Sequence, residues 1–460
     1  MPSRQDQLHS YQFTVQRAVA ALVMRETDPA RSPFRRLAGA GLASVLVAVI
    51  ALGGVATYGL FARGGSSWRD AGAVIVEKES GARFVYRENT LHPVLNYASA
   101  LLIIGADHPK TVLVSRRSIE GVPRGLPLGI PDAPDSLPSS GRLATGAWTV
   151  CSVDVTEAGR TEVSSALLIG RDAPGGRSLG EQALLLRHPD DSLHLLWHGR
   201  HYLLRDPDRV LAALAATPAR AVSVAPALLN TVPAGADLAP PPVRHLGEPS
   251  DRVTGATVGD VYLVRNSGGS RQYAVAERDG LAGITELQAA LLLARTGQGD
   301  PKPITLGRFA ALPKLPDRAP TGPAAPPAVP PRLATVDGGA LCARVGDDSG
   351  VPDVRMGVRP PDLTAAPPTA ADRGGLADRV LVEPGRGAVV EAVPAPGASG
   401  GAICVVTDLG RRHVLTGPDV LGMLGYAGVP PVRLPASLVS LVPAGSPLDP
   451  SAARTVAAPA

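Results

Sequence analysis

The clearest hydrophobic pattern in the chain is an uninterrupted apolar run near its N-terminus. Every position from Leu37 to Ala62 is uncharged, and five of them are glycine. About 20 apolar residues suffice to cross the hydrocarbon core of a bilayer, and glycine is more frequent in membrane helices than in soluble ones. The pattern therefore predicts a single transmembrane helix with its ends at Leu37 and Ala62.

The charges beside this run predict its orientation. Arg35 and Arg36 directly precede it, whereas Arg63 stands alone after it. Because arginines accumulate on the cytoplasmic side of membrane helices, the N-terminus is expected in the cytosol and the C-terminal bulk outside. A cleaved signal peptide is the alternative, but the region before the run is too long and no A-x-A site follows it closely.

The segment before the span predicts an amphipathic helix. Within residues 4–28, apolar side chains recur at steps of three and four, as on one helix face. They are Leu8, Tyr11, Val15, Val19 and Leu22. Two interpretations stay open: a helix lying on the membrane surface, or a docking helix for cytosolic parts of a larger assembly.

Beyond the span, short hairpin patterns recur along the chain. The segment 198–240 aligns with 409–450: each has strands around a tight turn, a helix opened by Pro-Asp, and an apolar strand ending in Val-Pro-Ala-Gly. Weaker copies begin at Val74 and Val261. We therefore expect an α+β fold with four small repeats. The prolines of 301–332 predict an extended, semi-rigid connector.

Composition and motifs argue against nucleic-acid binding and against two common types of catalytic site. The net charge is only +4 and aromatic residues make up 3% of the chain, so no basic, aromatic-rich face for nucleic acid is expected. A G-x-x-x-x-G-K-[ST] phosphate loop is absent from the sequence. Ser399 in Gly397–Gly401 faintly resembles a serine-protease nucleophile, but a Pro/Gly-rich turn is the better interpretation because a triad needs a positioned histidine and acid.

Two further sets of residues, the clustered histidines and the cysteines, are candidates for chemistry. His194, His198 and His201 cluster on one hairpin, but no carboxylate or cysteine nearby in sequence completes a zinc site, so surface histidines are expected. Three cysteines allow three pairings. The apolar neighbours of Cys404 favour a buried thiol there. We predict no metal, no cofactor and no catalytic residue.

Several blocks of the sequence resemble a known family. They are R-Q-D-Q-L-H-S-Y-Q-F (4–13), LHPVLNYASA (91–100), VSRRSIEGVPRGLPLGIPDAPDSLP (114–138) and DRVLVEPGRGAVV (378–390). Together they are similar to the EccB family, membrane components of the type VII (ESX) secretion system of actinobacteria. The resemblance implies four repeats around a central, mostly β domain built from separated segments. It also implies a disulfide between Cys151, in GAWTVC, and Cys342, in LCARVG.

The resemblance also implies a function. We expect a structural, membrane-anchored component of the secretion machinery that self-associates and assembles with an EccC-like FtsK/SpoIIIE ATPase, EccD and EccE. Cell-wall (peptidoglycan) binding by the repeats is an alternative. ATP hydrolysis has been suggested for the family, but this sequence offers no conventional nucleotide site, so we predict that the protein is not an enzyme.

These inferences combine into one predicted organisation. The predicted segments are a cytosolic arm (1–36), the span (37–62), repeat 1 (68–107), a first central segment (108–190), repeat 2 (191–240), repeat 3 (250–300), the Pro-rich connector (301–334), a second central segment (335–395), repeat 4 (396–450) and a tail (451–460).

Overall fold

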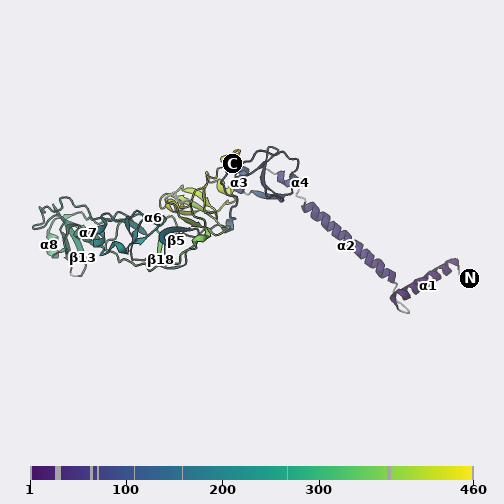
Figure 1. Ribbon diagram of the computed structural model, residues 1–460, viewed down its shortest axis with the longest axis horizontal. Coiled ribbons are helices and arrows are strands. Elements are labelled where there is room, and N and C mark those ends of the chain that lie inside the picture. Colours follow the sequence, from purple (N-terminus) through teal and green to yellow (C-terminus); the bar gives the residue numbers. More distant parts are fainter. Residues whose placement is uncertain are drawn as a thin grey trace.

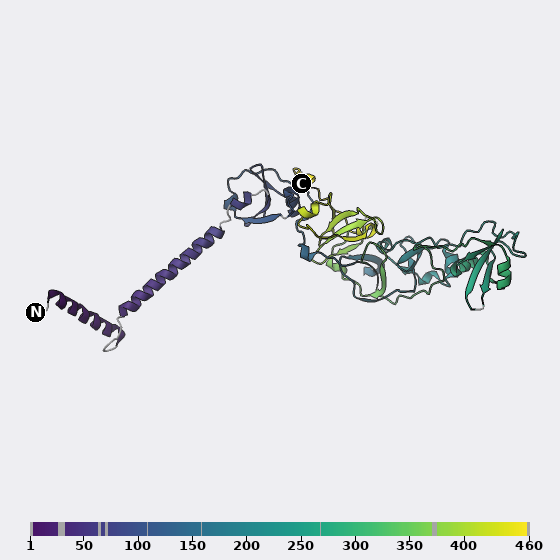
Figure 2. The ribbon, with the colours of Figure 1, turned by 180° about the vertical axis from the view of Figure 1, so that it is seen from behind.

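The computed structural model describes residues 3–25, 33–62, 66–69, 72–107, 109–157, 159–266, 268–369 and 375–457. Two helices, α1 (Arg4–Met24) and α2 (Pro33–Ala62), precede a β-rich region. In Figure 1 the β-rich region forms an elongated array, and α2 projects from one end of it. The view from behind shows the same order of parts (Figure 2). The expected α+β class with one apolar N-terminal helix is confirmed.

Four small sheets share one topology. In each, three antiparallel strands are followed by a helix and a fourth strand, which pairs in parallel with the first. A second short helix and a closing segment follow, and the closing segment pairs in parallel with the third strand. We call these units repeat 1 (73–128), repeat 2 (184–238), repeat 3 (261–315) and repeat 4 (388–448).

The elements of repeats 1 and 2 have the following bounds. Repeat 1 contains β1 (Ala73–Glu77), β2 (Arg83–Arg87), β3 (Thr90–Pro93), α3 (Tyr97–Ile104), β4 (Lys110–Val114) and α4 (Arg116–Ile119). Repeat 2 contains β8 (Leu184–Arg187), β9 (Leu193–Trp197), β10 (Arg200–Leu203), α5 (Pro207–Ala213), β11 (Val222–Ser223) and α6 (Pro226–Thr231).

Repeats 3 and 4 follow the same plan. Repeat 3 contains β12 (Val261–Arg265), β13 (Arg271–Glu277), β14 (Gly280–Ile284), α7 (Glu286–Thr296), β15 (Lys302–Ile304), α8 (Leu306–Ala311) and β16 (Lys314–Leu315). Repeat 4 contains β20 (Ala388–Val393), β21 (Ala402–Val406), β22 (Arg412–Val414), α9 (Val420–Met423), β23 (Val432–Pro435) and α10 (Ala436–Val439).

The central sheet joins two distant parts of the chain. Its strands run in the order β19-β6-β5-β17-β18-β7. Their bounds are β5 (Trp148–Glu157), β6 (Arg160–Leu168), β7 (Gly175–Ser178), β17 (Ala340–Val345), β18 (Asp353–Val358) and β19 (Arg379–Leu381). Because β5 pairs with β17, the outgoing and the returning segments of the chain are bound side by side.

Shared hydrophobic clusters fix the order of the units. Repeats 1 and 4 share a cluster that includes Val85 and Tyr426. Repeats 2 and 3 share another, in which Leu291 of α7 joins Leu195. The central sheet packs against both repeats 2 and 4 around Trp148. The array therefore runs repeat 1, repeat 4, central sheet, repeat 2, repeat 3, and repeat 3 lies farthest from α2 (Figure 1).

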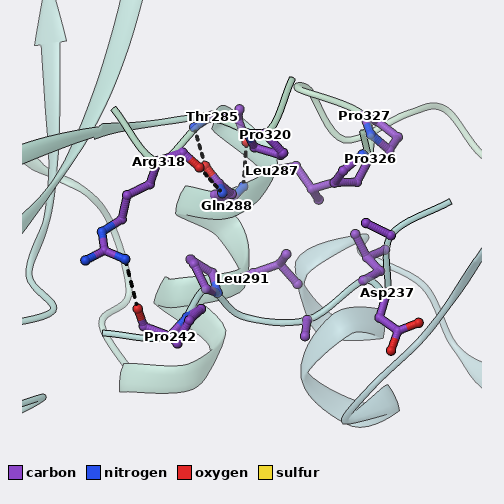
Figure 3. Close-up of a pocket in the computed structure, with 14 residues that line it drawn as sticks. Asp237, Pro242, Thr285, Leu287, Gln288, Leu291, Arg318, Pro320, Pro326 and Pro327 are labelled. Atoms are coloured by element: carbon purple, nitrogen blue, oxygen red, sulfur yellow. Dashed lines mark hydrogen bonds between the residues drawn. The ribbon is translucent and has the colours of Figure 1, made fainter. Parts of the chain in front are cut away.

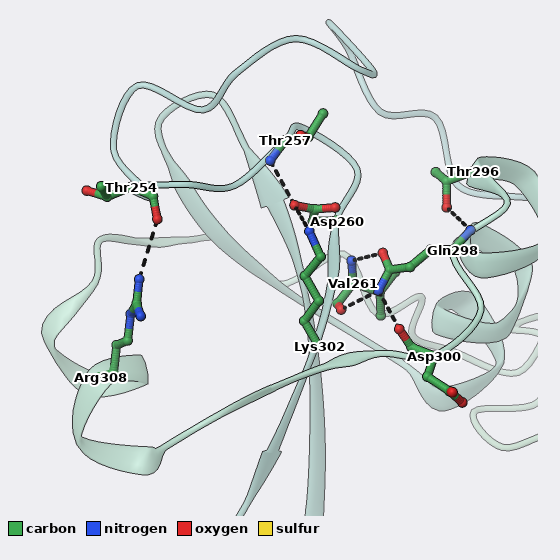
Figure 4. A network of polar contacts seen from close by, with 9 residues as sticks. All are labelled: Thr254, Thr257, Asp260, Val261, Thr296, Gln298, Asp300, Lys302 and Arg308. Carbon is green, nitrogen blue, oxygen red and sulfur yellow. Dashed lines mark hydrogen bonds and ion pairs between the residues drawn. The ribbon is translucent and has the colours of Figure 1, made fainter.

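A network of polar contacts surrounds the start of β12 in repeat 3, the last unit of the array (Figure 4). Asp260 accepts hydrogen bonds from Lys302 Nζ (2.6 Å) and from the Thr257 N–H (2.8 Å). The Gln298 side chain, just beyond α7, bonds both the N–H and the C=O of Val261 (3.0 and 3.1 Å). The first of these bonds gives the Val261 N–H an acceptor at the start of β12.

The repeats are longer than the sequence predicts. The predicted end of repeat 1 at residue 107 excludes β4, and the predicted starts at residues 191 and 396 exclude β8 and β20. Each omitted strand pairs within its sheet. Each also lies outside the two hairpin strands that made the repeat visible in the sequence. How the chain divides into separate folding units stays a prediction.

Two local predictions are wrong. The Pro-rich connector was expected to be extended from residue 301, but its first part contains β15, α8 and β16. Pro303 fits there because β15 is an edge strand, which tolerates a missing N–H. An apolar strand was expected before each Val-Pro-Ala-Gly, but a helix, α6 or α10, precedes it instead. Pro226 occupies the first turn of α6, where its missing N–H costs little.

Candidate functional site

The membrane anchor is the first candidate site. Among the described residues, α2 alone is long and apolar enough to cross a membrane, with its candidate span at Ala38–Val55. Side chains such as Leu42 and Leu52 are exposed, at 75% and 69% of their surface. A helix of this composition, apolar on all sides and exposed along its candidate span, is typical of one that contacts lipid.

The predicted topology residues lie at the ends of this helix. Arg35 and Arg36 occupy the first turn of α2, and the predicted span ends, Leu37 and Ala62, also fall inside it. The side chains of these four residues lie outside the described part of the structure. The orientation that they predict and the two span ends therefore stay predictions.

The cytosolic arm forms a helix, as its periodicity predicts. At the start of α1, the Ser3 side chain and the Asp6 side chain cap each other's backbone N–H groups. The helix ends at Met24, before the predicted stop at Asp28-Pro29, two residues outside the described part. Leu22 of the predicted apolar face is 80% exposed. The other four residues of this face, Leu8, Tyr11, Val15 and Val19, are also exposed in the described part of the structure.

A disulfide joins the two halves of the central sheet. Cys151 on β5 and Cys342 on β17 are bonded directly opposite each other, 191 positions apart in sequence. Cys404 on β21 is a buried free thiol, and burial raises its pKa. The bond joins the outgoing and returning segments of the chain at the middle of the array.

Each repeat closes through one recurring contact that sequence reasoning missed. In three repeats an aromatic ring on the third strand lies over the glycine of a Val-Pro-x-Gly segment. The pairs are His92 with Gly125, Tyr202 with Gly235, and His413 with Gly445. A Cβ on any of these glycines would lie within about 2.3 Å of a ring atom. The glycine is therefore required by the ring, because no larger side chain fits beneath it.

Repeat 3 makes the same contact with the sizes exchanged. Ala282 on β14 stands at the position of the ring, and its register partner on β16 is Leu315, at the position of the glycine. The large and small members have exchanged strands, which preserves the packed volume. In the sequence, this contact is visible as an aromatic residue followed, at a similar spacing in three repeats, by the glycine of a Val-Pro-x-Gly segment. The prediction missed it because Val122-Pro123-Arg124-Gly125 differs from the Val-Pro-Ala-Gly segments of repeats 2 and 4.

The candidate catalytic and metal-binding residues do not form a reactive site. Ser399 lies in the turn between β20 and β21, where Gly397 and Gly400 adopt positive φ. His413 Nδ1 contacts the Ser446 carbonyl (3.0 Å), and burial lowers the pKa of this histidine. Its ring is therefore committed to the closing segment of repeat 4.

The three clustered histidines divide into two environments. His194 and His201 touch through their Nδ1 atoms (3.1 Å), and burial lowers the pKa of His201 to about 4. His198 instead contacts Glu181 (2.8 Å) and stacks on Trp197. No group of three or more His, Cys, Asp or Glu side chains able to hold a metal occurs among the residues that the structure describes.

A cavity of about 230 Å³ lies between repeats 2 and 3 (Figure 3). Its lining is mostly apolar, with leucines and five prolines. Its two charged groups are already paired: Asp237 with Arg205 (2.7 Å), and Arg318 with Glu277. Arg318 also donates to the Pro242 carbonyl, and Gln288 donates to the Arg318 carbonyl. These pairs form within each repeat or with the linker, whereas the apolar lining joins the repeats, because Leu238 of repeat 2 packs with Leu287 and Leu291 of α7.

The comparisons with known proteins all match one protein family. The family described as "Type VII secretion system ESX-1, transport TM domain B" (EccB) matches residues 1–458. The chain is 29% identical to "ESX-3 secretion system ATPase EccB3" of Mycolicibacterium smegmatis, over 96% of this chain and 88% of that protein. It is 31% identical to "ESX-5 secretion system ATPase EccB5" of Mycobacterium tuberculosis, over 66% of this chain and 61% of that protein.

Solved structures give the same result for the fold. A chain of an intact ESX-5 inner membrane complex matches all of this chain, with a TM-score of 0.67 and 26% identity. An EccB3 dimer from an ESX-3 core complex matches 83% of this chain and 100% of its own, with a TM-score of 0.63. The likeness extends from the N-terminal helices through the repeat array.

Proposed function

Because this chain belongs to the EccB family of type VII (ESX) secretion proteins, we propose that it is a structural component of an ESX inner membrane core complex. It is anchored by α2 and carries its repeat array outside the membrane. The observation that carries the proposal is the exposed apolar helix α2 leading, within a few residues, into one elongated array. A single anchor on a stiff array suits a protein that sets the position of other components.

The printed titles of the structural neighbours suggest the partners. One is an intact ESX-5 inner membrane complex, and another is an EccB3 dimer from an ESX-3 core complex. We infer that this chain also self-associates and binds an EccC-like ATPase, EccD and EccE. Two surfaces support the proposal: the exposed apolar face of α1 in the cytosol, and the exposed sides of α2, where small residues allow close helix contact.

Co-purification from membranes tests this proposal. Three forms of the chain are compared: the full chain, a form without residues 3–25, and a form without residues 1–62. We expect the form without α1 to stay in the membrane but recover less of the partner proteins. The form without residues 1–62 should leave the membrane and recover none. Undiminished secretion and co-purification by this last form would refute an anchoring role.

The role that we propose involves no catalysis, although curated relatives carry "ATPase" in their names. No phosphate-binding loop occurs in the sequence, and both charged groups that line the cavity between repeats 2 and 3, Asp237 and Arg318, are engaged in ion pairs. The purified full chain should release phosphate from ATP at the background rate. Hydrolysis that co-elutes with the protein through successive columns, and that a point substitution removes, would contradict this prediction.

A further inference from the structure

The length of α2 sets where repeat 1 lies. Its 30 residues, Pro33–Ala62, extend about 45 Å at 1.5 Å per residue. A bilayer measures about 40–45 Å including its headgroups, so Ala62 reaches the outer headgroup layer. The next described residue is Ser66, and four extended peptide units cover at most about 14 Å. Repeat 1 must therefore begin at the membrane surface.

A buried tryptophan links the segment that follows α2 to the core of repeat 1. Trp68 lies in the 3-10 helix η1 (Ser66–Arg69) and is only 3% exposed. It packs with Val114 and Ile119 in one hydrophobic cluster, and its ring meets Tyr86 edge-on at 5.4 Å. The anchor is thus joined to the core of repeat 1, and the short helix α4, which contains Ile119, lies beside the junction (Figure 1).

Exposed arginines surround this junction cluster. Arg69 lies over the Trp68 ring, with 5.1 Å between Cζ and the ring centroid. Arg124 lies over Phe84 of the same cluster, at 4.3 Å. Arg116 and Arg117 occupy α4 and are both exposed. We call these four residues the junction arginines. Stacking on rings and the short helix hold their guanidinium groups in place at the end of repeat 1 that the anchor reaches.

The acids near the junction only partly offset these charges. Glu77 is nearly buried, and it accepts hydrogen bonds from Arg116 Nε (2.9 Å) and from Ser80. These bonds lower the pKa of Glu77 and keep it ionised. Glu79 accepts the Arg116 N–H (3.0 Å), and Glu120 is exposed. Lys78 is exposed at the same end, where its N–H bonds the Val114 carbonyl (2.9 Å). Among the described residues named here, cations exceed acids by two (five against three).

Two further acids, Asp107 in repeat 1 and Asp132 just after it, face repeat 4. Asp132 accepts the Ser446 N–H (3.0 Å) and lies 3.8 Å from Arg411, both in repeat 4. The Asp107 carboxylate lies against Gly422 of α9. The junction arginines therefore lie toward the anchor, and these two acids lie toward repeat 4. Charge facing the membrane is positive, which favours an anionic surface.

We propose that the junction arginines bind the phosphate groups of anionic phospholipids in the outer leaflet, so that repeat 1 rests on the membrane. The planar guanidinium group suits phosphate because it donates two parallel hydrogen bonds. Leu113 on β4, 58% exposed, lies next to Val114 of the junction cluster and can enter the interface beside the arginines. The array would then leave the membrane at a fixed angle. This inference requires α2 to span the membrane, but it does not require assembly into a secretion complex.

Hydrogen exchange on the full chain in nanodiscs tests the proposal. Two disc compositions are compared: phosphatidylcholine alone, and phosphatidylcholine with one-third phosphatidylglycerol. The peptides covering 114–121 should exchange at least about tenfold more slowly in the anionic discs, since each arginine adds about a fivefold preference for an anionic surface. Because the contact is exposed and ionic, 0.5 M NaCl should remove most of the difference.

Charge reversal supplies the decisive comparison. The R117E/R124E variant should show the same exchange in both discs, whereas R265E/R271E, an equal charge change in repeat 3, should behave as the unmodified chain. The neutral R117Q/R124Q variant guards against misfolding and should give an intermediate result. Equal exchange of the unmodified chain in both discs would overturn the proposal. So would a difference that R117E/R124E and R117Q/R124Q both leave intact. Co-migration of the chain with the discs verifies the anchor separately.

Discussion

The contact between Tyr202 and Gly235 gives the sharpest test of how a repeat closes. A methyl group added at Gly235 would lie 2.2 Å from Tyr202 Cε1 and 2.5 Å from Cδ1. Gly235 is not among the glycines with positive φ, so alanine fits its backbone and the clash is with the ring alone. Overpacking of this kind costs about 1–3 kcal/mol. We expect Gly235→Ala to destabilise repeat 2 by this amount.

A double-mutant cycle isolates the contact. Tyr202→Ala should itself cost about 3–5 kcal/mol, because it leaves a cavity and removes the hydrogen bond to the Ala325 carbonyl. In that background Gly235→Ala no longer meets the ring, so its cost should fall to about zero or become slightly favourable. The expected coupling between the two positions is therefore about 1–3 kcal/mol.

Local hydrogen exchange of β9 and β10 measures these effects, since a chain of several units need not unfold in two states. Gly299→Ala is the matched control, because nothing lies within 4 Å of its added Cβ. An equal cost of Gly235→Ala with and without the Tyr202 ring would refute the explanation of the repeated glycine.

Three further predictions follow from the same structure. Removing the disulfide (Cys151→Ala with Cys342→Ala) should lower the stability by about 5 kcal/mol, because it frees a long loop in the unfolded chain. Amide exchange should then be faster on both β5 and β17 than in the intact chain, and unchanged exchange on β17 would contradict this. The hairpin of repeat 2 should lose stability as the pH falls from about 6.5 to 4, because the folded pKa of His201 is depressed and protonation favours the unfolded form. His201→Gln should flatten the pH dependence of amide exchange on β10. An unaltered pH dependence would show that His201 is not the group responsible. Trp68→Ala should cost about 3–5 kcal/mol in repeat 1, seen as faster exchange of β1 and β4, while the distant repeat 3 stays unchanged.

The sequence predicted those features that depend on local patterns. The apolar run after Arg36 indicated α2 because length and lack of charge are sufficient for such a helix. Hairpin turns at Ser80-Gly81 and Gly268-Gly269 were found because turn residues separate short apolar strands. The cysteine pairing followed from the family resemblance, since three pairings were open on the sequence alone.

The sequence did not reveal features that depend on contacts between distant residues. The strand β8 lies before the visible hairpin of repeat 2, and its place follows only from pairing with β9 and β11. The packing of Trp68 was not predicted, because its partners on β4 and α4 lie some 45–50 positions later in the sequence. The ring-and-glycine pairs were missed for the same reason, as each joins residues about 30 positions apart.

The central claim is that α2 crosses the membrane with α1 in the cytosol and the repeats outside. Single cysteines introduced at Ser10 and at Ser399, both exposed, test it with a membrane-impermeant maleimide applied to intact cells. The account predicts that the S399C chain is labelled on intact cells and that S10C is labelled only after lysis. Labelling of S10C from outside, with S399C protected until lysis, would contradict the account.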